Sequence, residues 1–251
     1  MAPNQEVATV YAAESVAMDD SALKPAKRGG ATLTQVGEGG LIYLIGGANR
    51  EGASFGDVHC FDFETRAWKF VIPSSGSLSP RSGHSAVAIG SKIYVFGGFD
   101  VAAGATFNDV NVFDTRTLSW YEAAVEGEEP RPRNAHAAII LPEDDDSRET
   151  RRMLVHGGSS LEVGRICGDC CHYSDEEESW IHATLAECKT GNQTEPAMPE
   201  VPERFGHCGT TITVQPSNQP NAKATRQGLL IFGGMNAQSD LDDLVLIMTS
   251  C

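Results

Sequence analysis

Short apolar stretches that each end in a pair of glycines recur four times along the chain. They are rich in aliphatic and aromatic residues that favour β-strands. The stretches cover residues 41–47, 93–98, 153–158 and 229–234. The glycine pairs follow one another at intervals of 51, 60 and 76 residues. The pattern therefore predicts a repeated β-unit whose loops differ in length.

The spacing after each glycine pair is nearly constant. Counting from the second glycine, an Asp follows after 10, 11, 11 and 9 residues, and in the first three units a Trp follows after 21, 22 and 22 residues. The Asp residues are Asp57, Asp109, Asp169 and Asp243, and the Trp residues are Trp68, Trp120 and Trp180. Tight spacing inside the unit and loose spacing between units are expected of a structural repeat.

An arginine opens each unit upstream of its glycine pair. The four are Arg28, Arg81, Arg133 and Arg204, and in the last three units a histidine follows three residues later, as His84, His136 and His207. In the first unit Ala31 takes that position. Each unit predicts four short strands: a from the Arg, b into the glycines, c from the Asp and d around the Trp. Such units bury their faces only against one another, which predicts radial stacking into a β-propeller.

The double glycine, the apolar residue before it and the Trp near the end of the unit resemble the kelch repeat. The resemblance covers about residues 28–251 and implies an all-β, kelch-type propeller with about four recognisable four-stranded blades. We expect the blades at about residues 28–73, 80–125, 132–186 and 203–251. Relative to units one and two, units three and four carry insertions between strands a and b, at residues 142–152 and 215–227.

The last blade stops before strand d, because the expected Trp position lies beyond Cys251. Residues 1–27 form a separate N-terminal segment, and residues of about 6–15 resemble a strand d that could close the last blade; a helix or a disordered tail is the alternative. Four units are fewer than usual for kelch-like propellers. A closed ring of four, an open ring completed by a second chain and an unrecognised further blade all stay open, with the closed ring favoured.

The charge balance narrows the choice of partners. Against 34 acidic residues the chain has 19 Lys and Arg, so its formal net charge is −15. We therefore expect no nucleic-acid partner and no binding to an anionic membrane, since both surfaces attract cations. No apolar run reaches the roughly 18 residues of a membrane span, and the opening residues lack a signal-peptide pattern. With seven cysteines, an odd number, we expect a cytoplasmic location with reduced thiols.

Residues 167–172, which read Cys-Gly-Asp-Cys-Cys-His, look at first like a metal site. They fall at the start of strand c, where alternation puts Cys170 and His172 on one face and Cys171 and Tyr173 on the other. Small apolar core thiols are the favoured interpretation. A zinc site would need help from Cys188 or Cys208. The sequence predicts no metal and no cofactor.

The residues that recur at one repeat position are expected to be structural. A buried imidazole can satisfy groups between strands, and the four arginines can pair with acidic or carbonyl partners at strand ends. The acidic clusters at residues 143–146 and 175–178 indicate solvated loops. No catalytic motif is present, so we assign no catalytic residue.

The predicted function is that of a non-catalytic protein–protein interaction module, an adaptor or a subunit of a complex. The resemblance to kelch proteins implies that the d–a and b–c loops form the recognition face. The candidate partner-binding residues are Arg50, Phe99, Asp100, Phe107, Arg131, Arg165 and Asn236. The acidic ring favours a protein partner with basic segments. The alternative is a metal-dependent enzyme with its site at the propeller axis.

Overall fold

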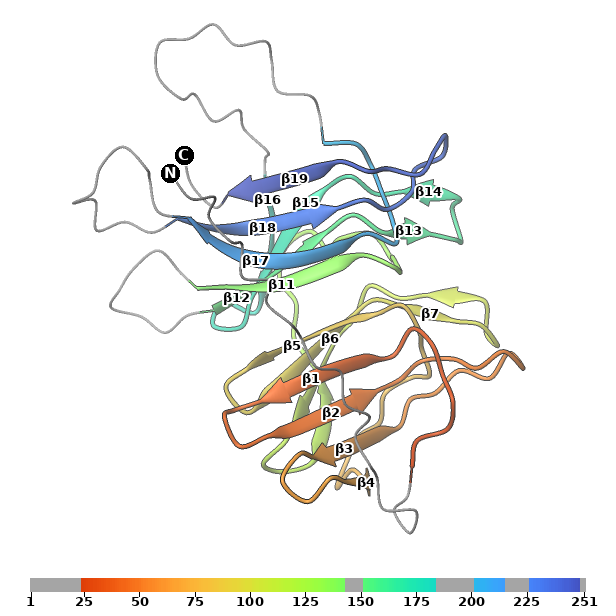
Figure 1. Ribbon diagram of the computed structural model, residues 1–251, viewed down its shortest axis with the longest axis vertical. Coiled ribbons are helices and arrows are strands. Elements are labelled where there is room, and N and C mark those ends of the chain that lie inside the picture. The colour runs from red at the N-terminus through yellow and green to blue at the C-terminus, as the bar shows by residue number, and fades with distance from the viewer. Residues whose placement is uncertain (1–23, 143–150, 184–200, 215–225, 249–251) are drawn as a thin grey trace, which may run out of the picture.

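The computed structural model describes residues 24–142, 151–183, 201–214 and 226–248, and every regular element in them is a β-strand. Fifteen of the 19 described strands form four antiparallel sheets that follow one another along the chain as the blades of a propeller (Figure 1). The predicted all-β propeller with four recognisable blades is therefore confirmed. The described residues contain no helix that is long and apolar enough to cross a membrane.

The first three blades have four strands each, and the described part of the fourth has three. Blade 1 consists of β1 (Thr32–Val36), β2 (Leu41–Ile45), β3 (Val58–Asp62) and β4 (Ala67–Val71). Blade 2 consists of β5 (Ser85–Ile89), β6 (Lys92–Phe96), β9 (Val110–Asp114) and β10 (Ser119–Glu122). Blade 3 consists of β11 (Ala137–Pro142), β12 (Arg151–His156), β15 (Cys170–Ser174) and β16 (Ser179–Ala183). Blade 4 consists of β17 (Cys208–Val214), β18 (Arg226–Phe232) and β19 (Leu244–Met248).

The b–c connections of blades 2 and 3 carry short hairpins of their own. These are β7 (Phe99–Asp100) with β8 (Ala105–Thr106), and β13 (Ser159–Ser160) with β14 (Arg165–Ile166). In Figure 1 these hairpins project from the same side of the molecule. The repeat pattern predicted the connections as loops, because two-residue strands leave no hydrophobic alternation to detect.

The hydrophobic core lies between successive blades. Side chains of blades 1 and 2 form one buried cluster that includes Ile45 and Phe113. A second cluster joins blades 2 and 3 around Phe96 and Trp180, and a third joins blades 3 and 4. Each sheet thus buries a face against its neighbour, which is the physical reason why the repeat forms a propeller.

The two end blades each expose an apolar face. On blade 1 the side chains of Leu33 and Phe70 are 65% and 46% exposed, and on blade 4 those of Phe232 and Leu244 are 51% and 65% exposed. Contacts link β1 to β5, β5 to β11 and β11 to β17, whereas β17 and β1 share no contact of this extent in the described ranges. The closing strand expected at residues 6–15 lies outside the described residues and stays a prediction.

Candidate interaction rim

The connections of the propeller meet at two opposite rims. The amide of Arg81, in the d–a connection that leads into β5 of blade 2, donates to the carbonyl of Phe55 in the b–c connection of blade 1 (3.0 Å). The b–c and d–a connections therefore share one side, which we call the loop rim. It comprises the b–c residues 46–57, 97–109, 157–169 and 233–243 and the later parts of the d–a connections, at residues 78–84, 128–136 and 201–207. The earlier parts of two d–a connections lie against c–d turns, because the amides of Ser74 and Glu126 donate to the carbonyls of Leu118 and Glu178. The a–b and c–d connections form the opposite rim, where the amide of Thr115 donates to the carbonyl of Ser91.

A buried arginine anchors the loop rim in every blade. Nη1 of Arg81 donates to the carbonyl of Gly97 (3.0 Å) and to Oδ1 of Asp109 (2.6 Å), and its Nη2 donates to Oδ2 of Asp109 (2.9 Å). One side chain thus fixes both ends of the b–c connection. The same contacts link Arg28 with Gly46 and Asp57, Arg133 with Gly157 and Asp169, and Arg204 with Gly233 and Asp243. The structure therefore supports the predicted role of these arginines as partners of acidic and carbonyl groups.

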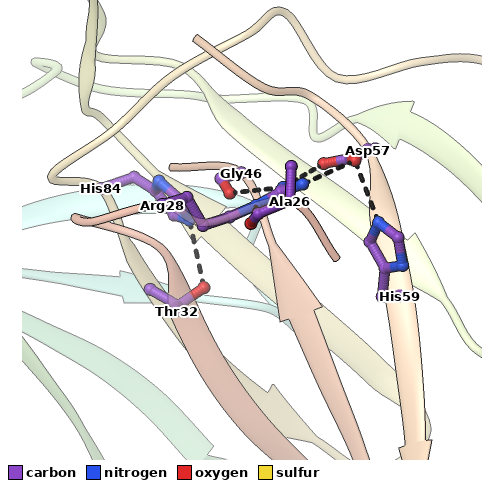
Figure 2. A network of polar contacts seen from close by, with 7 residues as sticks. All are labelled: Ala26, Arg28, Thr32, Gly46, Asp57, His59 and His84. Carbon is purple, nitrogen blue, oxygen red and sulfur yellow. Dashed lines mark hydrogen bonds and ion pairs between the residues drawn. The ribbon is translucent and has the colours of Figure 1, made fainter. Parts of the chain in front are cut away.

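Figure 2 shows this network in blade 1, where the guanidinium of Arg28 lies between the carbonyl of Gly46 and the carboxylate of Asp57. The ring of Phe55 stacks on the same guanidinium, 3.9 Å from ring centroid to Cζ. Burial alone would raise the pKa of Asp57, but hydrogen bonds from Arg28 and His59 hold that pKa below its ordinary value. The carboxylate is therefore kept ionised and paired.

The recurring histidines lie between blades. Nε2 of His84 in blade 2 lies 3.1 Å from Oγ1 of Thr32 in blade 1, and Nε2 of His136 lies 2.8 Å from Oγ of Ser85. Nε2 of His207 lies 3.4 Å from Nδ1 of His156. Burial lowers the pKa of His84 to about 3 and that of His207 to about 4. These imidazoles are neutral and pack between neighbouring blades. In the described part of the chain they form no group able to hold a metal.

The glycine pairs form the other half of each contact between blades. Gly98 has a φ of 103°, and its amide donates to the carbonyl of Arg133 in the next blade (2.8 Å). A Cβ on Gly98 would lie only 2.9 Å from Cβ of His84. The amides of Gly47 and Gly158 make the same bond to Arg81 and Arg204. Only glycine combines this backbone conformation with so close an approach.

The seven predicted partner-binding residues all lie in b–c or d–a connections. Arg50, Arg131 and Arg165 are exposed. The other four also shape the loops themselves. Phe107 stacks on Arg81 at 4.0 Å, and Phe99 pairs through its backbone with Ser82. Side-chain oxygens of Asp100 and Asn236 accept amide hydrogen bonds from residues two and three positions later. Their role in partner binding stays a prediction.

Sequence reasoning missed the exposed apolar side chains of the loop rim. Val101, Leu161, Val163 and Met235 are 46%, 56%, 60% and 42% exposed. Val101, Leu161 and Val163 lie between the strands of the two hairpins in blades 2 and 3, and Met235 lies in the b–c connection of blade 4. The available signal was an apolar residue within a few positions of a loop glycine, as in residues 101–104 and 161–164. The prediction favoured Arg and aromatic residues and so passed over these aliphatic ones.

The cysteine-rich strand is placed as alternation predicted. Cys170 packs in the core between blades 3 and 4, whereas Cys171 and Tyr173 pack in the core between blades 2 and 3. Burial raises the pKa of Cys170 to about 12 and raises that of Cys171 further, so both are thiols. The structure places one neighbour that the sequence did not suggest. His182 of β16 lies directly across from Cys171.

Comparison with known proteins identifies relatives of this architecture. A family model for the KLHDC2/KLHL20/DRC7 Kelch-repeats domain matches residues 13–212. Kelch domain-containing protein 3 of Homo sapiens is 28% identical over 206 residues, which cover 78% of this chain and 45% of the relative. Acyl-CoA-binding domain-containing protein 4 of Arabidopsis thaliana is 33% identical over 121 residues, which cover 48% of this chain and 18% of the relative.

The human Rab9 effector protein with kelch motifs is 33% identical over 119 residues, which cover 47% of this chain and 30% of the relative. The chain thus spans less than half the length of each of these relatives.

Proposed function

The chain belongs to the kelch-repeat family, and on that premise we propose that it is a non-catalytic interaction module whose loop rim binds a partner protein. Kelch-repeat propeller domains generally mediate protein–protein interactions. The relative named as a Rab9 effector is consistent with an adaptor role. We propose the same kind of role here, as an adaptor or a subunit of a complex in the cytoplasm.

The observation that carries the proposal is the set of exposed aliphatic side chains on the loop rim. Val101, Leu161 and Val163 stand on hairpins whose bases are fixed by buried Arg–Asp pairs. A rigid scaffold that presents apolar side chains on loops loses little conformational entropy on binding. Larger exposed apolar patches rimmed by polar residues mark interaction sites.

The charge of the loop rim indicates the chemistry of the partner. Its exposed acidic residues are Glu51, Glu128, Glu129, Glu162, Glu203, Asp240 and Asp242, whereas its exposed basic residues are Arg50, Arg131 and Arg165. A segment with basic residues flanking an apolar side chain would complement this surface. Nucleic acid and anionic membranes are disfavoured because the rim and the whole chain carry excess negative charge.

A capture experiment with a matched control tests the proposal. The intact chain, immobilised at moderate salt, is compared with the double variant Leu161→Asp/Val163→Asp and with Phe63→Asp. Phe63 is a matched control because it is 55% exposed on the opposite rim. We expect a stoichiometric partner to be lost with the double variant and retained with Phe63→Asp. Equal capture by all three proteins would refute the assignment to the loop rim.

A further inference from the structure

Three groups that can donate electron pairs converge beneath the loop rim in blade 3. A carboxylate oxygen of Asp169, the sulfur of Cys171 and a ring nitrogen of His182 all lie within 4.8 Å of one another. Asp169 ends the b–c connection, Cys171 is the second residue of β15, and His182 faces it from β16. The cluster is separate from the histidines between the blades.

The distances within the cluster match those between ligands of one metal ion. Sγ of Cys171 lies 3.4 Å from Oδ2 of Asp169 and 3.3 Å from Nδ1 of His182. A tetrahedral zinc ion with its usual bond lengths places a sulfur and a nitrogen ligand roughly 3.5 Å apart. The two strands therefore hold these atoms at the right separation without any change of register.

One of the two contacts that Cys171 makes inside the cluster has no proton to form a hydrogen bond. Nε2 of His182 lies 3.1 Å from the carbonyl of Glu128, which can only accept, so Nε2 carries the hydrogen. In the neutral imidazole Nδ1 is then an electron-pair donor. The carboxylate of Asp169 also accepts two hydrogen bonds from Arg133. The single S–H proton of Cys171 can serve either Asp169 or Nδ1 of His182, and the other contact is left between two electron-pair donors. A cation at the centre would make both contacts favourable.

The other blades show that this arrangement is not a property of the repeat. The residue two positions after the Asp is His59 in blade 1 and Asn111 in blade 2. Nε2 of His59 lies 3.0 Å from Oδ2 of Asp57, and Nδ2 of Asn111 donates to Oδ2 of Asp109 at 2.7 Å. The residues across the strand are Phe70 and Glu122. Among the described blades, only blade 3 combines sulfur with imidazole at these two positions.

We propose that Asp169, Cys171 and His182 form a binding site for a thiophilic divalent cation, with zinc as the expected ion. Sulfur, imidazole and carboxylate are zinc ligands, and the exposed edge of His182 leaves room for water as a fourth ligand. Binding releases the thiol proton of Cys171 to solvent and forms the zinc–thiolate bond. Arg133 orients Asp169, and the carbonyl of Glu128 orients His182, as second-shell partners of metal ligands do.

The site has a structural consequence for the loop rim. Glu128 belongs to the d–a connection between blades 2 and 3, which contacts β16 first through the backbone of Glu126 and Trp180 and then through the carbonyl of Glu128 and His182. An ion bound to His182 fixes that imidazole and so fixes the connection that precedes Arg131. Zinc would therefore stabilise the d–a connection at the loop rim rather than act as a catalytic centre.

Equilibrium dialysis of the full chain against Zn²⁺, followed by elemental analysis, tests the site. His182→Phe copies the residue of blade 1 and changes an exposed side chain, so it leaves the core intact. Cys171→Ser removes the thiolate, and Cys208→Ser is the control at an exposed cysteine. We expect one zinc ion per wild-type chain, at least tenfold weaker binding in His182→Phe and Cys171→Ser, and unchanged binding in Cys208→Ser.

Two further readouts separate the site from a general affinity for thiols. Cobalt(II) bound to the wild-type chain should show a thiolate charge-transfer absorption that disappears in Cys171→Ser. Zinc should raise the thermal midpoint of the wild type but not that of His182→Phe. Equal zinc affinity in the wild type and His182→Phe, with both variants folded by circular dichroism, would overturn the proposal. Failure of the wild type to bind zinc stoichiometrically would overturn it as well.

Discussion

Arg81 holds Asp109 through two parallel hydrogen bonds of 2.6 and 2.9 Å, although 28 residues separate the two along the chain. The same arginine accepts the amide hydrogen of Gly47 from the preceding blade on its carbonyl oxygen. One residue thus fixes the b–c connection of its own blade and joins that blade to its neighbour. Because the pair recurs four times, the loop rim has a rigid base.

Replacement of Arg81 by lysine should destabilise the propeller although the charge is kept. Lysine cannot reproduce the two parallel bonds to Asp109 or the bond to the carbonyl of Gly97, because it lacks the planar fork. We expect a loss of about 2 kcal/mol in the free energy of unfolding, rising to about 3–5 kcal/mol for Arg81→Ala. Urea unfolding provides the measurement. Arg116→Lys at an exposed position is the control, and equal midpoints for Arg81→Lys and Arg116→Lys would contradict the prediction.

Substitution of two different glycines, Gly98 and Gly104, distinguishes the cost of backbone strain from the cost of close packing. Gly98 and Gly104 both have positive φ, 103° and 66°, but only Gly98 is crowded. A Cβ there meets His84 at 2.9 Å, whereas one on Gly104 meets no atom within 4 Å. Gly104→Ala should therefore cost about 1 kcal/mol from strain alone. Gly98→Ala should cost about 3 kcal/mol, since the backbone around Gly98 must also move away from His84 and Ser82 of the same blade. Similar thermal midpoints for the two variants would argue against the tight contact.

The buried histidines should make the protein sensitive to mild acid. Burial lowers the pKa of His84 and of His156 to about 3, whereas the unfolded chain titrates near the ordinary histidine value of 6.5. Below that value the unfolded state binds more protons, so the free energy of unfolding falls as the pH falls. Between about pH 7.5 and pH 5 the loss should reach about 2 kcal/mol for each of these two histidines.

The aspartates titrate in a separate pH window. Burial alone would raise the pKa of Asp169, but hydrogen bonds from Arg133 hold that pKa below the ordinary value of 3.8. Hydrogen bonds from Arg204 hold the pKa of Asp243 below the same value. Their contribution is therefore present above pH 3.8 and is lost only as the pH falls below it. Urea unfolding at a series of pH values would show both windows, and His156→Leu should shrink only the first. Stability that stays constant from pH 7.5 to pH 5 would contradict the histidine assignment.

The rim arginines are expected to contribute to partner affinity without contributing to folding. Arg50, Arg131 and Arg165 are exposed, so alanine at each should change the free energy of unfolding by less than about 0.5 kcal/mol. For a captured partner we expect at least one of the three to weaken binding by about tenfold. Titration calorimetry of each variant would measure the effect. Unchanged affinity in all three would remove these residues from the interface.

The sequence predicted the propeller because its structural contacts are periodic. Arg81 and Asp109, with the glycine pair between them, recur at nearly fixed spacing, so their role could be inferred without coordinates. The exposed Val101 and Leu161 have no counterpart at fixed spacing, because loops that are free to vary carry no repeat signal. The neighbours Cys171 and His182 are separated by 11 residues and meet only through strand register. Such a contact can be recognised only once both strands are placed.

Hydrogen–deuterium exchange of the intact chain, with and without its captured partner, tests the interaction rim most directly. Binding at the loop rim predicts slower exchange in the b–c hairpins of residues 97–109 and 157–169. It also predicts no change in the turns of the opposite rim at residues 62–67 and 114–119. Protection of the opposite rim, or of the exposed faces of blades 1 and 4 alone, would contradict the proposal that the loop rim is the binding surface.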